Sequence, residues 1–337
     1  MKLVKLRFKS GDVKSYNLDL TLKPSFVSSL YDKEDLFYWV KRVGLYANLL
    51  SLRQRNDSLE AYIKYEVDDR IREVILHESG LWDESPASRI SKLNAPLKEH
   101  IKALTEVFPG VRLSIAPHDF DCILVASILS RRTNYEVFVR KWVKNIWDLW
   151  RCDLKLIANL SPSDIKNVGT SYQLLNLIKT LRDYVNMSYR RDKIEDVRRA
   201  LMLCWGVGPK IADAVLLFTT KSSWIVPCDT HLWRVSRRLG WASQEDRLPT
   251  KTLCLSYYCD ECVDKYGPCL RETIKSLFPD FGGWIQTLAY LFGSSICLSR
   301  KPKCYLCHPT LKECCEMIET RNKLSLLKTG AQVGLKT

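Results

Sequence analysis

A glycine-punctuated turn followed by a lysine constrains this chain more than any other feature. Residues 206–213 read Gly-Val-Gly-Pro-Lys-Ile-Ala-Asp, between two segments with helical spacing of apolar residues, 194–203 and 210–218. Gly206 and Gly208 permit positive φ and close backbone approach, and proline suits the first turn of a helix. We therefore expect two helices joined by a tight turn, whose free N–H groups and helix dipole bind an anion such as a DNA phosphate. An ordinary helical hairpin is the plainer alternative.

Cysteines gather toward the end of the chain. Nine of the thirteen lie within residues 254–315, and the last group reads Cys297-x6-Cys304-x2-Cys307-x6-Cys314. The start of the chain carries no secretory signal, so clustering favours metal over disulfides, although intracellular disulfides in hyperthermophiles keep that alternative open. Four thiolates at this spacing can bind a [4Fe–4S] cluster or a zinc ion, and the spacing alone does not choose between them.

A second cysteine group falls in an apparent insertion at about 250–275. Its members are Cys254, Cys259, Cys262 and Cys269, spaced C-x4-C-x2-C-x6-C. A second metal site and a pair of disulfides are both compatible with this spacing.

The charge balance favours a polyanionic partner. The formal net charge is +14, which favours nucleic acid over a membrane surface as the binding partner. The alternative is that the charges only solvate the protein surface. No apolar run approaches the roughly 18–20 residues that span a bilayer. We expect a soluble intracellular protein, either cytoplasmic and nucleoid-associated or nuclear.

The periodicity of apolar residues divides the chain in two. The first part alternates like strands and also has helical pieces, with strands expected at 3–8, 36–40, 46–52 and 61–65 and helices near 68–78 and 95–107. Helical spacing then dominates, at 120–129, 135–149, 163–166, 172–185, 194–203, 210–218, 230–239 and 283–292. The expected fold class is α+β, with a small antiparallel β-rich N-terminal domain before a mainly α-helical core.

The hairpin and the segment after it resemble the helix-hairpin-helix DNA glycosylase superfamily, which includes endonuclease III and 8-oxoguanine glycosylase. The strings GVGPKIADAVLLF and VPCDTHLWRVSRRLGW carry the likeness, and the matching stretch runs from about 118 to 315. The resemblance implies a base-excision repair enzyme that binds double-stranded DNA and flips a damaged base out, because the glycosidic carbon is shielded within the duplex.

In bifunctional members of that family, a lysine and an aspartate at the positions of Lys210 and Asp229 carry the chemistry. A neutral amine can attack the anomeric carbon of the sugar and leave a Schiff base, and partial burial favours the neutral form. The carboxylate can stabilise positive charge on the sugar or move protons. Asp229 also suits the N-cap of the next helix, and the two roles do not exclude each other. Asp213 could form an ion pair with Lys210, although we favour the simpler interpretation that it is a polar residue near the start of a helix.

The resemblance favours a [4Fe–4S] cluster over zinc for the last cysteine group. The family pattern ends x5-Cys, whereas here Cys307 is followed by x6 to Cys314 and x7 to Cys315. We expect Cys297, Cys304, Cys307 and Cys314 as ligands, with Cys315 as the alternative to Cys314. The loop between the first two ligands carries basic residues that either contact phosphates or are simply solvated: Arg300, Lys301 and Lys303.

Two stretches near the front of the chain read Asn17-Leu18-Asp19-Leu20-Thr21-Leu22 and Phe37-Tyr38-Trp39-Val40-Lys41. They resemble the N-terminal domain of 8-oxoguanine and alkyladenine glycosylases. Two departures leave the substrate open, because Lys23-Pro24-Ser25-Phe26 replaces the glycine-glutamine turn of that branch and Ala214 replaces its cysteine. Arg132 is the best candidate to fill the hole left by a flipped base. His231 either touches phosphate or is a packed, hydrogen-bonded histidine.

The sequence thus predicts four segments: a β-rich domain at 1–110, a glycosylase domain at 111–296, a cluster loop at 297–320 and a polar tail at 321–337. The expected protein is a monomeric DNA glycosylase and AP lyase for an oxidised base, with 8-oxoguanine-type purines favoured over pyrimidines. The alternatives are a monofunctional glycosylase, a non-catalytic iron–sulfur protein that binds lesions, and a zinc-dependent nucleic-acid scaffold.

Overall fold

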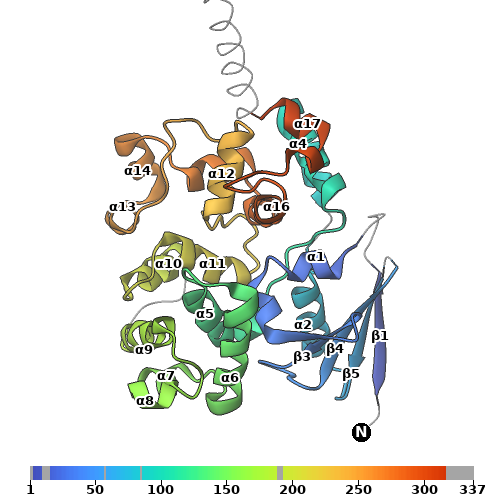
Figure 1. Ribbon diagram of the computed structural model, residues 1–337, viewed down its shortest axis with the longest axis vertical. Helices are drawn as coiled ribbons and strands as arrows, with labels where there is room; N and C mark the ends of the chain where they lie inside the picture. Colours follow the sequence, from blue (N-terminus) through green and yellow to red (C-terminus); the bar gives the residue numbers. More distant parts are fainter. Residues whose placement is uncertain (1–2, 10–15, 57, 84–85, 188–192, 316–337) are drawn as a thin grey trace, which may run out of the picture.

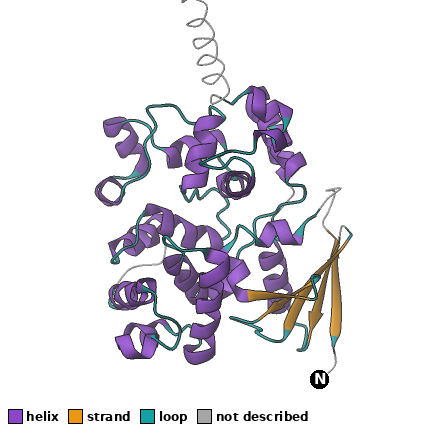
Figure 2. Cartoon of the chain, viewed as in Figure 1, coloured by secondary structure: helices purple, strands orange, loops and turns teal. Residues whose placement is uncertain are grey.

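The structure is a computed structural model that describes residues 3–9, 16–56, 58–83, 86–187 and 193–315. A small sheet lies beside a larger helical region (Figures 1 and 2), which confirms the expected α+β class. The predicted tail at 321–337 lies outside the described residues. Within the described part, no helix is long and apolar enough to cross a membrane.

The front domain is built on a five-stranded antiparallel sheet in the order β1-β5-β4-β3-β2. Its strands are β1 (Val4–Lys9), β2 (Tyr31–Glu34), β3 (Tyr38–Lys41), β4 (Leu50–Arg55) and β5 (Ser58–Ile63). The sequence reading missed β2 and began β4 too early. Tyr46 and Asn48 have positive φ, at 62° and 63°, so residues 46–49 form a turn before β4.

Four helices and a 3-10 turn complete the first part of the chain: α1 (Leu18–Leu22), η1 (Phe26–Leu30), α2 (Asp69–Ser79), α3 (Pro86–Ser91) and α4 (Ala95–Val107). Asp68 caps α2 by accepting from the Ile71 N–H, and Asn94 caps α4 in the same way. Buried residues of α2 and of the sheet belong to one continuous apolar core.

The helical region follows the predicted order closely. Its first half, which we call the hairpin lobe, contains η2 (Pro117–Asp119), α5 (Phe120–Leu129), η3 (Tyr135–Val139), α6 (Arg140–Trp150), α7 (Leu154–Ala158), α8 (Pro162–Ile165), α9 (Tyr172–Val185), α10 (Ile194–Leu203) and α11 (Pro209–Thr219). In this lobe the sequence reading missed the short elements η2 and α7. It placed α9 and α10 at the bounds that the structure has.

The second half, the cluster lobe, contains α12 (Thr230–Arg238), α13 (Lys251–Ser256), α14 (Cys259–Tyr266), α15 (Leu270–Leu277), α16 (Gly282–Ser295), η4 (Cys304–Leu306) and α17 (Pro309–Glu313). The predicted insertion at 250–275 forms α13, α14 and the start of α15. Helix α4 lies beside α17 in Figure 1, and His308 Nε2 is 2.9 Å from a Glu106 carboxylate oxygen. The expected 1–110 unit therefore includes a helix that packs on the far end of the chain.

A buried ion cluster joins the front domain to the hairpin lobe. Lys41 Nζ lies 2.7 Å from Asp119 Oδ2 and also bonds Glu78, which in turn accepts from the Tyr31 hydroxyl. All four side chains are buried. Because removal of Lys41 would leave the buried carboxylates without a cation, we expect that deletion to cost about 3–5 kcal/mol. This contact fixes the front domain against the site described next.

Candidate active site

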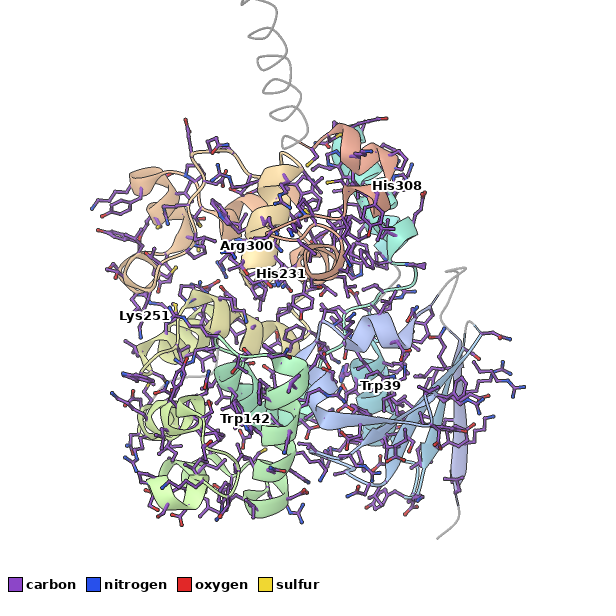
Figure 3. The ribbon with its side chains drawn as sticks, viewed as in Figure 1. Trp39, Trp142, His231, Lys251, Arg300 and His308 are labelled. Atoms are coloured by element: carbon purple, nitrogen blue, oxygen red, sulfur yellow. The ribbon has the colours of Figure 1, made fainter. Side chains whose placement is uncertain are left out.

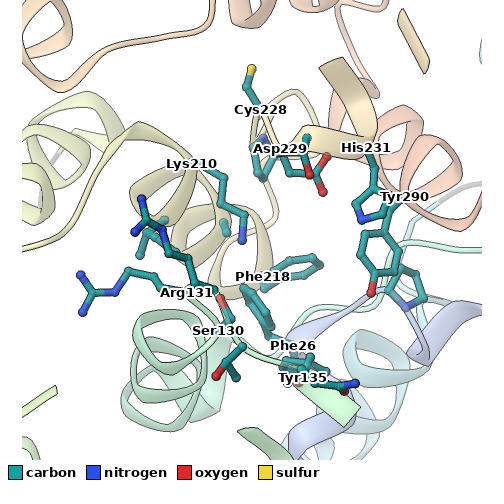
Figure 4. Close-up of a pocket in the computed structure, with 18 of the residues that line it drawn as sticks. Phe26, Ser130, Arg131, Tyr135, Lys210, Phe218, Cys228, Asp229, His231 and Tyr290 are labelled. Atoms are coloured by element: carbon teal, nitrogen blue, oxygen red, sulfur yellow. Dashed lines mark hydrogen bonds between the residues drawn. The ribbon is translucent and has the colours of Figure 1, made fainter. Parts of the chain in front are cut away.

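An open cleft of about 930 Å³ lies where the front domain meets the two helical lobes (Figure 4). The front domain contributes Lys23, Pro24 and Phe26. The hairpin lobe forms what we call the hairpin wall, which includes Gly206, Lys210, Ile211, Ala214 and Phe218. The cluster lobe forms the carboxylate wall, which includes Pro227, Cys228, Asp229, Thr230, His231, Gln286 and Tyr290.

Lys210 is the second residue of α11 and reaches into the cleft (Figure 4). Its Nζ lies 5.3 Å from the centroid of the Phe26 ring. Among the described residues, no acceptor or carboxylate is bonded to this amine. Burial lowers the pKa of Lys210 below its ordinary value of 10.5, while the negative charge of Asp229 acts in the opposite direction. Burial therefore shifts the Lys210 amine toward its neutral form.

Asp229 caps α12, as the sequence predicts. Its Oδ1 accepts from the Leu232 N–H at 2.7 Å, and its Oδ2 accepts from the Gln286 side-chain amide at 3.1 Å. Two donors from two helices thus fix the carboxylate at the cleft. The sequence analysis overlooked Gln286, although a buried amide within the apolar run of α16 is a usable signal.

The two hairpin glycines play different roles. Gly206 has a φ of +68°, and a Cβ there would come within 2.0 Å of Arg131 Nη1. Arg131 donates to the Gly206 carbonyl at 2.6 Å, which ties the turn to the end of α5. Gly208 does not adopt the positive φ that a glycine permits. It is the extended N-cap of α11 with a φ of −109°, and a Cβ there would meet nothing within 4 Å. Its open face suits close approach of a ligand to the free N–H groups of the helix.

Arg132 and His231 also line the cleft. Arg132 is exposed and has a φ of +50°, so its side chain can reach outward. His231 packs edge-on against Tyr290, with ring centroids 5.0 Å apart, and its Nδ1 lies 3.1 Å from Arg234 Nη2. The packed, hydrogen-bonded reading of this histidine therefore fits the structure.

Asp213 does not pair with Lys210. Its carboxylate is buried and receives two bonds from Arg198, at 2.6 and 3.1 Å, and Arg271 Nε lies 3.3 Å away. This network binds α11 to α10 and to α15. Asp213 therefore holds the hairpin in place and leaves Lys210 unpaired.

Four thiols of the last cysteine group line a small apolar-walled cavity beside α16 and α17. They belong to Cys297, Cys304, Cys307 and Cys315. Cys314, our expected fourth ligand, is exposed and lies outside this cavity. The reason is local, because α17 ends at Glu313 and Cys314 becomes its C-cap. The next residue then turns back toward the other three thiols.

Helix α12 connects this cavity with the cleft. Asp229 caps its first turn, and Arg238 at its last turn donates to the Cys297 sulfur at 3.1 Å. The basic loop residues Arg300, Lys301 and Lys303 are exposed and do not line the cleft. In Figure 3, Arg300 and His231 lie on the same lobe.

No family model matches the chain. Over 206 residues it is 30% identical to endonuclease III of Thermotoga maritima, an alignment that covers 60% of this chain and 84% of that protein. This chain belongs to the helix-hairpin-helix DNA glycosylase superfamily. It is also 32% identical over 99 residues to the N-glycosylase/DNA lyase of Saccharomyces cerevisiae, which covers 25% of this chain and 26% of that protein.

A solved structure shows the same glycosylase fold over nearly the whole chain. The apo form of the Clostridium acetobutylicum 8-oxoguanine glycosylase/lyase matches with a TM-score of 0.62 at 14% identity, covering 86% of this chain and 96% of that chain. At this identity the match supports the fold alone. Because it covers 86% of this chain, it includes most of the front domain.

The insertion that carries the second cysteine group contacts the hairpin of this glycosylase. The members of this group are thiols in the structure. Cys259 accepts from Arg271 at 3.0 Å and Cys262 from Arg247 at 2.8 Å. Lys251, labelled in Figure 3, donates to the Cys204 carbonyl at 3.0 Å, just before the hairpin turn. Metal binding and disulfide formation by this group both remain predictions.

Proposed function

We propose that Lys210 is the nucleophile and Asp229 the supporting carboxylate of this enzyme. The chain is a DNA N-glycosylase with DNA lyase activity, the class to which its relatives belong. The observation that carries the proposal is the shared cleft. An unpaired, partly desolvated lysine and a hydrogen-bonded carboxylate reach into it from opposite lobes.

The proposed reaction begins with a flipped nucleotide in the cleft. The neutral Nζ of Lys210 bonds to C1′ of the sugar as the bond from C1′ to the base breaks, and the base leaves with that electron pair and a proton. Sugar ring opening leaves a Schiff base between Nζ and C1′. Loss of a C2′ proton then breaks the C3′–O bond and nicks the strand. Asp229 stabilises the positive charge that builds on the sugar or accepts a proton.

Aromatic side chains suit the cleft to a planar base. Phe26 lies with its ring centroid 5.4 Å from those of Tyr135 and Phe218, and Tyr290 also lines the cleft. Stacking on such faces does not depend on one particular base. The fold shared with an 8-oxoguanine glycosylase/lyase favours an oxidised purine, with an oxidised pyrimidine second. Lys23 and Ala214 lie on the cleft, where they would contribute to this choice.

The cluster cavity fits a [4Fe–4S] cluster. Four soft thiol donors line this apolar-walled cavity, and Arg238 donates to one of the sulfurs. We assign the ligands to Cys297, Cys304, Cys307 and Cys315. When bound, the cluster would supply a structural cross-link that holds the end of the chain against α12 and α16.

The proposed DNA-binding surface combines the hairpin turn with the exposed cations. The Gly208 N-cap offers an open helix start, Arg132 stands at the cleft, and the loop at 300–303 adds three exposed positive charges. These groups would contact phosphates without reading sequence.

A panel of duplexes tests the function. Each duplex carries an oxidised purine, an oxidised pyrimidine or no damage, and base release and strand nicking are measured separately. We expect both products from one lesion duplex, fastest for the oxidised purine, and no nicking by Lys210→Gln. Faster release of the pyrimidine would overturn the substrate preference. Base release without nicking by the wild-type protein would reduce the enzyme to a monofunctional glycosylase.

A further inference from the structure

Two histidines and a glutamate converge at the seam between the front domain and the hairpin lobe, away from the cleft and the cysteines. Glu73 and His77 lie one turn apart on α2, and His118 lies in η2 just before α5. One ligand atom from each of the three residues lies within 4.8 Å of the other two. Imidazole and carboxylate are donors that zinc-class cations accept.

The separations suit a shared ion better than direct hydrogen bonds. His77 Nε2 is 3.7 Å from Glu73 Oε1, and His118 Nε2 is 3.5 Å from Glu73 Oε2. Direct N–H···O bonds fall at about 2.7–3.2 Å. Around one four-coordinate ion with metal–ligand bonds of about 2.0–2.1 Å, neighbouring donors are about 3.4 Å apart. The three side chains therefore need only small shifts to close on a cation.

Buried nitrogen atoms at this seam lack partners. Within the described residues, His77 Nδ1 and His118 Nε2 are buried and have no hydrogen-bond partner. Buried polar atoms are normally paired, so each exception needs an explanation. His118 Nε2 faces the Glu73 carboxylate, and a bound cation would supply its missing partner.

The site is held by backbone and open on one side. The His77 carbonyl accepts from the Ile115 N–H at 3.0 Å, and the Ala116 N–H donates to the Phe218 carbonyl at 2.7 Å. His77 is buried, whereas the Glu73 side chain is 45% exposed, so water can supply a fourth ligand. A cation here would join α2 to the segment that leads into the hairpin lobe.

One neighbouring charge competes with a cation. Lys221 Nζ lies 3.1 Å from Glu73 Oε1. Its side chain is 57% exposed, so it can swing into solvent at little cost. Without a metal, the lysine would act as the counter-ion of the carboxylate.

We propose that Glu73, His77 and His118 form a zinc-class divalent cation site that links the front domain to the hairpin lobe. Its role is structural, and it is separate from both cysteine groups. The proposal predicts opposite changes in zinc affinity for two kinds of variant. Removing a ligand weakens binding, whereas removing the competing lysine strengthens it.

The test is equilibrium dialysis of the cluster-containing full chain against Zn²⁺, together with thermal unfolding. We expect His118→Asn to bind one equivalent fewer at the same free zinc, with an affinity loss at this site of at least about 100-fold. Lys221→Met should bind it about fivefold more tightly, since a like charge near 4 Å is removed. Zinc should raise the unfolding midpoint of the wild-type protein but not of His118→Asn.

The matched variant Glu73→Gln keeps the side-chain shape and removes the charge that a cation needs. It should behave like His118→Asn. Equal zinc stoichiometry and equal midpoints in the wild-type protein and His118→Asn would overturn the site. Weaker zinc binding by Lys221→Met would do so too, because it would show that the lysine supports the group rather than competes with the ion.

Discussion

The two walls of the cleft hold their functional groups in opposite ways. On the hairpin wall, Lys210 has no bonded acceptor among the described residues and only the Phe26 ring against its amine. On the carboxylate wall, Asp229 accepts from both a helix N-terminus and Gln286. The amine therefore loses solvation without gaining a partner, whereas two hydrogen-bond donors hold the carboxylate in place.

This difference matches the roles that we propose for Lys210 and Asp229. A nucleophilic lysine must be neutral and free to move toward carbon. A carboxylate that stabilises positive charge must stay ionised and fixed, because electrostatic stabilisation depends on preorganised geometry. Asp213 completes the arrangement, since its pairing with Arg198 and Arg271 takes the nearest carboxylate on α11 away from Lys210.

The largest effect is expected from Asp229→Asn. We predict that base release on the preferred lesion duplex slows by about 10²–10⁴-fold in single-turnover assays. Folding should change little, because asparagine also caps helices, and circular dichroism melting checks this. If release is within about threefold of the wild-type rate, the carboxylate wall has no catalytic role.

Gln286→Leu tests whether fixing the Asp229 carboxylate by hydrogen bonding contributes to base release. It removes the donor to Asp229 Oδ2, and a hydrogen bond to a charged group is worth about 1.5–3 kcal/mol. We predict base release about 10–100-fold slower, without loss of duplex affinity. Combined with Asp229→Asn, the loss should be less than additive, because both changes act through one carboxylate. Additive losses would show that Gln286 acts elsewhere.

Adjacent cysteines provide a matched pair for the cluster behind the carboxylate wall. A [4Fe–4S] cluster contains about four irons per chain. We predict that Cys315→Ser purifies with much less iron than this, whereas Cys314→Ser retains the full iron content. Loss of the cluster should also lower the thermal midpoint, because metal binding contributes to folding. Iron and sulfide analysis of anaerobically prepared proteins decides the matter. The reverse result would restore Cys314 as the ligand.

The smallest effect concerns pH. Because burial lowers the pKa of Lys210 below 10.5, nicking of an abasic-site duplex should rise with pH through a midpoint below that value. The Asp229 charge raises this pKa, so Asp229→Asn should move the midpoint to lower pH. A pH profile of single-turnover nicking measures both. An unmoved or higher midpoint would mean that the two walls are not electrostatically coupled.

Local signals in the sequence predicted much of this arrangement. The Gly-Val-Gly-Pro turn and the Asp229 cap are set by neighbouring residues, so the hairpin, α12 and the positions of Lys210 and Asp229 could be read directly. The contribution of Phe26 could not, because it reaches the cleft from the front domain through tertiary packing. The orientation of Cys314 and Cys315 depends on where α17 ends, which no spacing rule fixes.

Borohydride trapping tests the central role of Lys210 most directly. The wild-type protein and Lys210→Gln are each incubated with the preferred lesion duplex and borohydride, and covalent protein–DNA adducts are resolved by denaturing gel. Reduction of a Schiff base should give an adduct with the wild-type protein. Peptide mapping should place it on Lys210, and Lys210→Gln should give none while still binding DNA. An adduct that persists in Lys210→Gln would place the nucleophile elsewhere and contradict the assignment.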